Sequence, residues 1–333
     1  MTQSPRLRVG ACLSLSGRYA RFGTQARLAL QIWQTTDEAE LIVEDDHSDP
    51  DVLENRLHRL IDRCDVILGP YSTQLMRRAG TVAATRDRLL WNHGGSGDDV
   101  ESAHPGHIVS ILTPTSGYAE PFVRRVLAPR PSRELWIAQG RGRFGRQVAD
   151  GAEEVAHSLG IPTNRLTPDE PLPTTSAAWS LLCAGSFEED IARVLSAQAS
   201  ATPPEVICAV AAGVHEFGEH VTRPTGIYGI GQWFPGGTET PHLGMTEEEF
   251  VESYRRAVGA SPDYPAVQAA ATATIAAHCT RHAQDPTRAA VWRAALDLET
   301  TTMFGRFKID QHGVQTGHQA ALTRWTDEGL STA

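Results

Sequence analysis

Short apolar runs alternate along the first third of the chain with longer segments in which apolar positions recur at helical spacing. The segment at residues 20–33 puts Ala26, Leu30 and Trp33 on one stripe, and Pro50 opens the next helix at its first turn. The apolar runs predict strands at residues 6–16, 40–44, 65–68, 88–92 and 108–112, and two further helices at 74–85 and 122–127. This βαβα order is typical of a parallel, doubly wound sheet.

The same rhythm begins again after a Pro-rich turn, "APRPSR", at residues 128–133. Strands are predicted at residues 135–139, 180–184, 206–210 and 226–230, with helices at 144–159 and from 188. Two later helices are predicted at 246–258 and 266–282, and Thr246 with Glu249 fits a capping box. Residues 304–325 alternate around Gly313 and predict a β-hairpin or meander. The pattern therefore predicts an α/β protein with two doubly wound lobes.

The composition is that of an ordinary globular chain, and its charge excludes several partners. The 333 residues carry a net charge of -10, which disfavours binding to nucleic acid or to an anionic membrane surface. Lys308 is the only lysine, so no Walker motif is present. No run approaches the ~20 apolar residues of a membrane span. Five cysteines without a C-x-x-C motif predict no disulfide framework, and Cys12, Cys183 and Cys208, which lie inside apolar runs, are expected to be buried.

The first residues, "MTQSPRLR", lead almost directly into a strand pattern. They contain no charged segment followed by an apolar one, so no signal peptide is predicted and the chain as it stands is expected to be cytoplasmic. A chain from which an export signal had been removed would have the same start. An extracytoplasmic location is therefore the alternative.

Gly140, Gly142 and Gly145 follow a predicted strand at G-x-G-x-x-G spacing, which raises the possibility of a dinucleotide-binding loop. Such a loop needs an acidic residue ~20 positions further on to hold the ribose. Asn164 and Arg165 occupy that region. A nicotinamide-dependent enzyme is therefore a less favoured alternative, and no cofactor is expected.

Two further motifs are weak signals for catalysis or metal binding. The acidic segment "EDDHSDP" at residues 44–50 is expected to form turns and helix caps, and no metal site is predicted there. The segment "HGGSG" at 93–97 is similar to a nucleophile elbow around Ser96, but Asp98 stands where that motif requires glycine. We therefore expect no catalytic residue and no enzyme.

Small polar and aromatic residues recur where successive predicted strands end. In open α/β sheets ligands bind outside the carboxyl ends of the strands. Ser72 and Thr73 also precede a predicted helix, whose first N–H groups favour an anion such as a carboxylate. Aromatic side chains such as Phe144 and Phe187 would cover apolar parts of a ligand. The pattern favours a ligand-binding protein.

Seven segments, in order, resemble the type I periplasmic binding proteins, in particular the branched-chain amino-acid and amide receptors. They are "VGACLSLSGRYARFGTQARLAL", "VEDDHSDP", "VILGPYSTQ", "LLWNHGGSGDDV", "RFGRQVADG", "EEFVESYRRAVGASPDYPAVQAAATA" and "FGRFKIDQHGVQTG". The resemblance implies two α/β lobes that close on a ligand. Residues 1–115 with 240–300 would form lobe one, and 116–239 with 301–333 would form lobe two.

The resemblance also implies the ligand-binding residues. Carboxylate-binding positions fall on Thr73, Gly95 and Ser96, and the backbone N–H groups of Gly94 and Gly95 are expected to approach the ligand. The full expected set is Phe22, Tyr71, Ser72, Thr73, Gly94, Gly95, Ser96, Tyr118, Phe144, Phe187, Gln232 and Trp233.

One departure concerns the acidic residue with which amino-acid receptors of this family pair the ligand's ammonium group. Ala211 stands nearest that place, so the partner looks absent unless Asp98, Asp99 or Glu188 reaches the ligand. We therefore expect a non-enzymatic receptor for a small carboxylate or amide, serving an ABC transporter permease. The alternative is a cytoplasmic sensor that binds a regulatory protein.

Overall fold

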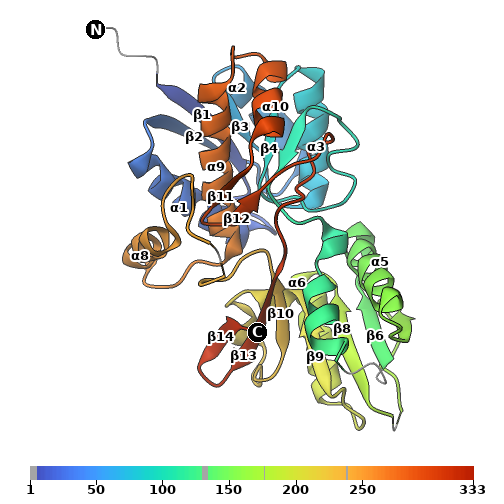
Figure 1. The fold of residues 1–333 in the computed structure, drawn as a ribbon. Helices are drawn as coiled ribbons and strands as arrows, with labels where there is room; N and C mark the ends of the chain where they lie inside the picture. Colours follow the sequence, from blue (N-terminus) through green and yellow to red (C-terminus); the bar gives the residue numbers. More distant parts are fainter. Residues whose placement is uncertain (1–5, 130–133, 176, 238) are drawn as a thin grey trace. The chain divides into compact units, whose positions relative to one another are not determined.

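The chain forms two compact units in the computed structural model, which describes residues 6–129, 134–175, 177–237 and 239–333. Unit 1 comprises Met1–Leu112 with Thr238–His318, and unit 2 comprises Thr113–Gly237 with Gln319–Ala333. The chain thus passes between the units three times, as the two-lobed fold class predicts (Figure 1). The first five residues and the core of the predicted Pro-rich turn, 130–133, lie outside the described residues.

Unit 1 is built on a five-stranded parallel sheet with the order β2-β1-β3-β4-β5. The strands are β1 (Leu7–Leu13), β2 (Ala39–Asp45), β3 (Val66–Leu68), β4 (Leu90–Asn92) and β5 (Ile108–Ser110). Each lies within or overlaps a predicted strand. The order reverses between β1 and β3, so the switch point of this sheet, where ligands bind in such folds, lies at the carboxyl ends of these two strands.

Six helices belong to unit 1. They are α1 (Ala20–Thr36), α2 (Pro50–Ile61), α3 (Thr73–Thr85), α8 (Glu247–Val258), α9 (Tyr264–His282) and α10 (Arg288–Asp297). α1 packs against α9, and α2 packs against α3. α9 is buried along most of its length, whereas α2 buries a Leu53–Leu57–Leu60 stripe, as its amphipathic pattern requires. The capping box of Thr246 and Glu249 at the start of α8 is confirmed.

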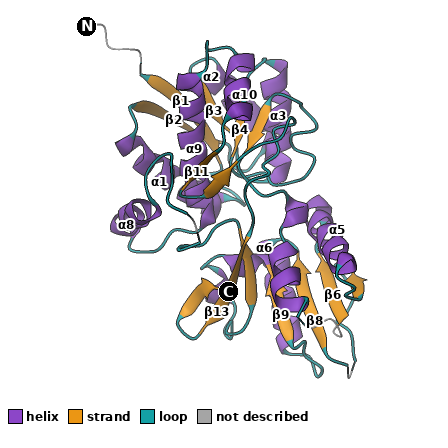
Figure 2. Ribbon diagram, viewed as in Figure 1, coloured by secondary structure: helices purple, strands orange, loops and turns teal. Residues whose placement is uncertain are grey.

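Unit 2 contains a seven-stranded sheet with the order β14-β13-β10-β9-β8-β6-β7 (Figure 2). Its parallel strands are β6 (Glu134–Gln139), β7 (Thr163–Leu166), β8 (Trp179–Ala184), β9 (Val206–Ala209) and β10 (Tyr228–Gly231). β13 (Ala321–Thr326) and β14 (Gly329–Thr332) form an antiparallel hairpin, of which only β13 overlaps the predicted segment 304–325. The strand order reverses between β6 and β8, which gives this unit a switch point of its own.

The helical segments of unit 2 cover both faces of its sheet. They are η1 (Thr115–Gly117), α4 (Glu120–Phe122), the π-helical η2 (Val123–Leu127), α5 (Gly142–Ser158), α6 (Phe187–Gln198), η3 (Val210–Gly213) and α7 (Phe217–His220). One apolar core joins α5 and η2 to the sheet around Phe122 and Val148. A second core packs Val194 of α6 and Phe217 of α7 against Trp179 and Trp325.

Residues 301–318 pack in unit 1, whereas the sequence analysis placed them in lobe two. β11 (Thr300–Thr302) and β12 (Gly305–Phe307) form a separate antiparallel hairpin. Its neighbourhood is fixed by hydrogen bonds from His242 N–H to the Thr301 carbonyl at 3.0 Å and from Gln315 Nε2 to the Ile111 carbonyl at 3.1 Å. Alternation along the chain predicts a strand but does not say which sheet or unit it joins. Within the described part of the chain, no helix has the length and apolar character to span a membrane.

Candidate functional site

Two of the expected aromatic residues meet at the switch point of unit 1. Phe22, in the first turn of α1, and Tyr71, in the loop after β3, stack with ring centroids 4.2 Å apart and an interplanar angle of 16°. The Tyr71 hydroxyl lies 3.4 Å from the hydroxyl of Tyr264 at the start of α9. Both stacked rings are only partly buried. They form an apolar surface at the place where this fold class binds ligands.

Ser72 and Thr73 connect this surface to α3. Ser72 is the N-cap residue, with φ 85°, and its hydroxyl accepts a hydrogen bond from Leu75 N–H at 3.3 Å. The Thr73 hydroxyl accepts from Gly97 N–H at 3.0 Å. Because Thr73 Oγ accepts in that bond, its own proton is the group it can donate to an anion. The Ser72 side chain therefore caps α3, and Thr73 is the better candidate for a ligand contact.

The glycine loop after β4 lies close to the same segment. A Cβ atom on Gly94 would come within 2.6 Å of Tyr71 Cα, so only glycine permits this approach. The N–H groups of Gly94 and Gly95 donate to Asn92 Oδ1 at 3.1 and 2.8 Å. Both N–H groups are therefore bonded to the buried side chain of Asn92 at the end of β4, and their approach to a ligand stays a prediction. Ser96, the next residue, is partly exposed.

Asn92 and Glu101 are buried polar residues of this region that the sequence analysis missed. The Ser110 hydroxyl donates to Glu101 Oε1 and accepts from Asn92 Nδ2. Burial raises the pKa of Glu101 to about 7, and the nearby carboxylate of Asp98 adds to the increase. The one sequence signal was an asparagine at a strand end directly before a glycine-rich loop, a residue that commonly bonds the backbone two positions on.

The acidic segment after β2 is hydrogen-bonded to the loop after β1. Asp46 Oδ1 accepts from the Ser14 hydroxyl and from Ser48 N–H, both at 2.7 Å. Asp49 caps α2 by accepting from the N–H groups of Asp51 and Val52, as predicted. Among the described residues, no group of three or more His, Cys, Asp or Glu side chains is arranged to hold a metal ion.

In unit 2, the expected aromatic residues lie at the starts of the helices that follow β6 and β8. Phe144, in the first turn of α5, packs edge-on against Tyr118 with centroids 5.7 Å apart. Phe187, the first residue of α6, packs in the same way against His220 at 5.7 Å. Phe144 and Phe187 are partly buried, whereas Tyr118 is 6% exposed. The two helix starts thus present the predicted aromatic surfaces at the carboxyl ends of adjacent strands.

Gln232 and Trp233, which follow β10, are both buried. Gln232 Oε1 accepts from Thr113 N–H, and Gln232 Nε2 donates to the Thr113 carbonyl, each at 3.0 Å. The amide is therefore fully engaged with the backbone at the start of unit 2. A buried amide with two such bonds would lose both of them on turning towards a ligand, so Gln232 is not one of the proposed ligand contacts.

Asp190 on α6 is a second buried acid that the sequence analysis missed. Its carboxylate accepts from Gly185 N–H after β8 at 2.8 Å and from Ala211 N–H after β9 at 2.9 Å. Burial raises its pKa to about 7. Asp190 thus ties two strand-end loops together beside the place expected to hold an ammonium partner. Its sequence signal was hidden, since acidic residues in a first helical turn are usually exposed.

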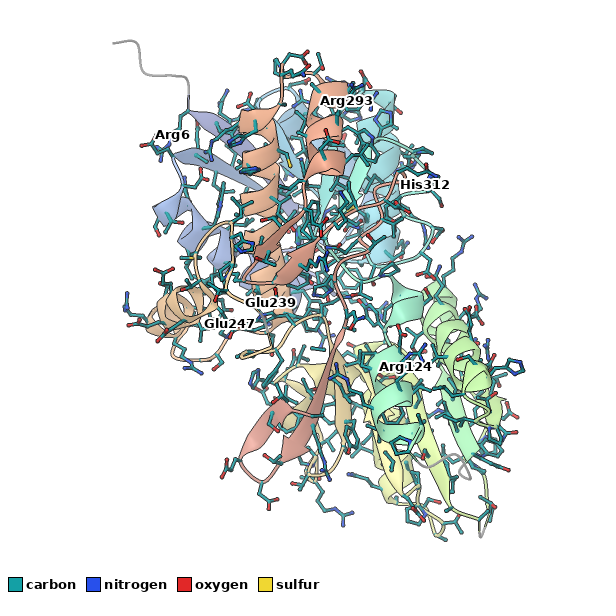
Figure 3. All side chains as sticks on the ribbon, in the orientation of Figure 1. Arg6, Arg124, Glu239, Glu247, Arg293 and His312 are labelled. Atoms are coloured by element: carbon teal, nitrogen blue, oxygen red, sulfur yellow. The ribbon has the colours of Figure 1, made fainter. Side chains whose placement is uncertain are left out.

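The glycine motif of residues 140–145 is explained by packing. A Cβ atom on Gly145 would lie 2.6 Å from the Ala184 carbonyl oxygen, so this glycine lets α5 approach β8. Arg141 N–H donates to Glu189 Oε1 at 3.0 Å, and the Arg141 guanidinium pairs with Asp169 at 2.5 Å. The charged side chains of Arg124 on η2 and Arg293 on α10 are exposed (Figure 3).

Comparison with known proteins agrees with this architecture. The sequence model of a family described as "Periplasmic binding protein" matches residues 6–329. Solved structures with the same fold include a leucine binding protein, LivK, from Thermotoga maritima (TM-score 0.79, 15% identity, covering 98% of this chain and 97% of that one). LivJ from Streptococcus pneumoniae, in complex with isoleucine, has TM-score 0.77 and 13% identity, covering 98% and 99%.

A third similar structure is a solute binding protein of an ABC transporter from R. palustris, in complex with benzoate. It has a TM-score of 0.75 and 14% identity, covering 98% of this chain and 95% of that one. Among curated proteins, none matches the sequence.

Proposed function

On the premise that this chain belongs to the periplasmic binding protein family, we propose that it is a receptor for a small carboxylate or amide that carries an apolar part. The family and the fold are those of solute-binding receptors. The structurally similar LivJ is in complex with isoleucine and the R. palustris protein with benzoate, so both bind a carboxylate attached to an apolar group.

One observation carries the proposal. Tyr71, whose ring stacks on that of Phe22 at the switch point of a parallel sheet, lies two residues before Thr73, whose hydroxyl accepts from Gly97 N–H and can donate its own proton. A ring surface takes an apolar group, and a hydroxyl at the start of a helix takes a carboxylate oxygen. In this proposal Thr73 and Ser96 bind the carboxylate, and Phe144 and Phe187 of unit 2 contribute further apolar contacts.

Closure of the two units on the solute, expected from the family resemblance, is part of the proposal; binding energy would then favour the closed arrangement. An ABC transporter permease is the proposed partner. The family is described as periplasmic, which is consistent with export and does not support the cytoplasmic location expected from the first residues.

The experiment is isothermal titration calorimetry with L-isoleucine and with benzoate as probes. The paired substitution Thr73→Ala and Ser96→Ala should weaken binding of the probe that the native protein takes up by at least tenfold without lowering the melting temperature by more than a few degrees. Thr85→Ala, at the exposed end of the same helix, is the matched control and should bind normally. Unchanged affinity in the paired variant would reject the assigned carboxylate contacts.

A further inference from the structure

A continuous chain of buried polar groups lies beneath the glycine loop after β4. It runs from the backbone of Gly94 and Gly95 through the Asn92 side chain to the Ser110 hydroxyl at the end of β5, and from there to Glu101. Asn92 is 0% exposed, Ser110 2% and Glu101 4%. Buried polar networks are stable only when their members are satisfied, so the detailed pairing matters.

The Asn92 amide uses its full hydrogen-bonding capacity. Its Oδ1 accepts from Gly94 N–H and Gly95 N–H. Its Nδ2 donates to the Gly95 carbonyl at 2.7 Å and to Ser110 Oγ at 2.6 Å. Rotating the amide by half a turn would point its N–H groups at two other N–H groups, so the orientation is fixed by the partners.

No other common side chain fits this set of partners. Aspartate at position 92 could accept from the two glycines but could not donate to the Gly95 carbonyl or to Ser110. Leucine could do neither, and would leave buried N–H and C=O groups unpaired. The Ser110 hydroxyl accepts from Asn92 and donates onward to Glu101, so Glu101 fixes the direction of the Ser110 proton. The chain therefore has one consistent arrangement of donors and acceptors.

We propose that Asn92, anchored through Ser110 to Glu101, is the positioning residue for the loop of residues 94–96 that carries Ser96 to the ligand. The inference rests on the proposed function, because Ser96 is one of the proposed carboxylate contacts. Asn92 does not itself reach the ligand, since its four bonds are all made within the protein. It acts by fixing the backbone on which Ser96 is mounted.

Glu101 makes this anchoring sensitive to pH. Between its ordinary pKa and the value of about 7 in the folded protein, the Glu101 carboxyl is protonated when buried and ionised when hydrated, so opening of the loop becomes more favourable as the pH rises to about 7 and changes little above it. The groups around it do not reverse this effect. Asp98 adds repulsion, Arg77 is paired with Asp99, and buried His93, whose pKa burial lowers to about 4, stays neutral. The loop should therefore open more readily at pH 8 than at pH 6.

The test is amide hydrogen exchange of the full-length protein labelled with ¹⁵N-glycine, without any ligand. Asn92→Leu should speed exchange at Gly94 and Gly95 by about tenfold or more. Gly97, whose N–H bonds to Thr73, and Gly10 in β1 serve as internal controls and should change less. Faster exchange at Gly10 as well would mean that Asn92→Leu destabilises the whole unit. In that case the milder variant Ser110→Ala, which removes one hydroxyl, is used, and its exchange at Gly94 and Gly95 is compared with that at Gly97 and Gly10.

A pH profile separates positioning from a general loss of packing. In the native protein the protection of Gly94 and Gly95, corrected for intrinsic exchange, should fall from pH 6 to pH 8. Glu101→Gln keeps an acceptor for the Ser110 hydroxyl but cannot titrate, so this fall should be absent. Two results would overturn the inference. One is that Ser110→Ala changes the exchange rates of Gly94 and Gly95 no more than those of Gly97 and Gly10. The other is that the protection of Gly94 and Gly95 falls between pH 6 and pH 8 as much in Glu101→Gln as in the native protein.

Calorimetry on the same samples with L-isoleucine and benzoate separates this inference from the proposed function. Faster loop exchange in Asn92→Leu with binding at least tenfold weaker than native supports both. Faster loop exchange with no binding of either probe by any sample rejects the proposed carboxylate contacts and leaves the anchoring in place. Native-like loop exchange in the variants, with tight binding by the native protein, rejects the positioning role alone.

Discussion

The side-chain amide of Gln232 and the backbone of Thr113 exchange two hydrogen bonds of 3.0 Å, although 119 residues separate them in the sequence. Thr113 is the first residue of unit 2, directly after Leu112, the last residue of the first segment of unit 1. Gln232 comes from the end of β10, five residues before unit 2's long segment ends at Gly237. One buried amide therefore fixes the start of unit 2 to the segment that leads out of it.

Gln232→Leu should lower the free energy of unfolding by about 1–3 kcal/mol, because it leaves the N–H and C=O groups of Thr113 buried without their partner. Urea denaturation followed by far-ultraviolet circular dichroism measures this. Gln31→Leu, on the exposed side of α1, is the control and should change stability by less than about 0.5 kcal/mol. Equal stabilities for the two variants would show that the Thr113 bonds contribute nothing.

Phe22 and Tyr71 should be energetically coupled. Stacked aromatic pairs contribute about 0.5–1.5 kcal/mol beyond the area they bury. A double-mutant cycle with Phe22→Leu and Tyr71→Leu, measured by urea denaturation, should return a coupling free energy in that range. The same cycle built on Phe122 and Phe250, which lie in different units, should return none. Strict additivity for Phe22 and Tyr71 would contradict the observed stacking.

Stability should fall as the pH rises through 7. Glu101 and Asp190 both have pKa values raised to about 7 by burial, so the stability they contribute is fully present below their unfolded pKa values and is lost above 7. The losses amount at most to about 3 kcal/mol for Glu101 and about 4 kcal/mol for Asp190, given about 1.4 kcal/mol per pKa unit. Glu101→Gln should therefore be more stable relative to the native protein at pH 8 than at pH 5.

Chemical denaturation at pH 5, 6, 7 and 8 measures this trend. The lowered pKa values of Asp45 and Glu249 act in the opposite direction only at acidic pH, because such carboxylates lose their contribution as the pH falls through the folded pKa. Between pH 6 and 8 the contribution of Asp45 and Glu249 is constant, so it adds nothing to the trend. A native protein whose stability is flat or increases across that interval would show that Glu101 and Asp190 are not raised as described.

The helix cap at Thr246 gives a test of local structure. Thr246→Ala removes the hydroxyl that accepts from Glu249 N–H at 3.2 Å and should cost about 1 kcal/mol. Thr246→Ser keeps the hydroxyl and should restore most of the loss. Differential scanning calorimetry of the two variants decides the matter, and an equal decrease in melting temperature for both would argue against the capping box.

Much of the fold could be predicted because its signals are local. The strand ends at Leu68 and Asn92 and the N-cap of α8 at Thr246 follow from apolar runs and capping residues, whereas the first strand ends at Leu13, three residues before its predicted end. The placement of residues 301–318 could not, because the choice between two sheets depends on contacts such as that of Gln315 with Ile111, which join residues 204 positions apart.

The contacts within the candidate site could not be predicted from the sequence. Nothing in the sequence indicated that Phe22 and Tyr71 stack, and the ligand-binding roles assigned to these residues and to Thr73 stay predictions. The partners of Gln232 and three of the four partners of Asn92 are backbone groups, which every residue possesses and no sequence pattern distinguishes. Buried acids such as Asp190 are equally hidden, because burial of a first-turn residue depends on how its helix packs.

The central claim, that the protein is a receptor for a small carboxylate or amide, is tested most directly by a thermal-shift screen of the native protein. The panel contains amino acids, aromatic and aliphatic acids, amides and NAD. A ligand present at about 100 times its dissociation constant stabilises the folded state by about 2.7 kcal/mol, which a melting curve resolves. We predict that a small carboxylate or amide raises the melting temperature and that NAD does not; a shift produced by NAD and by none of the small solutes would contradict the claim.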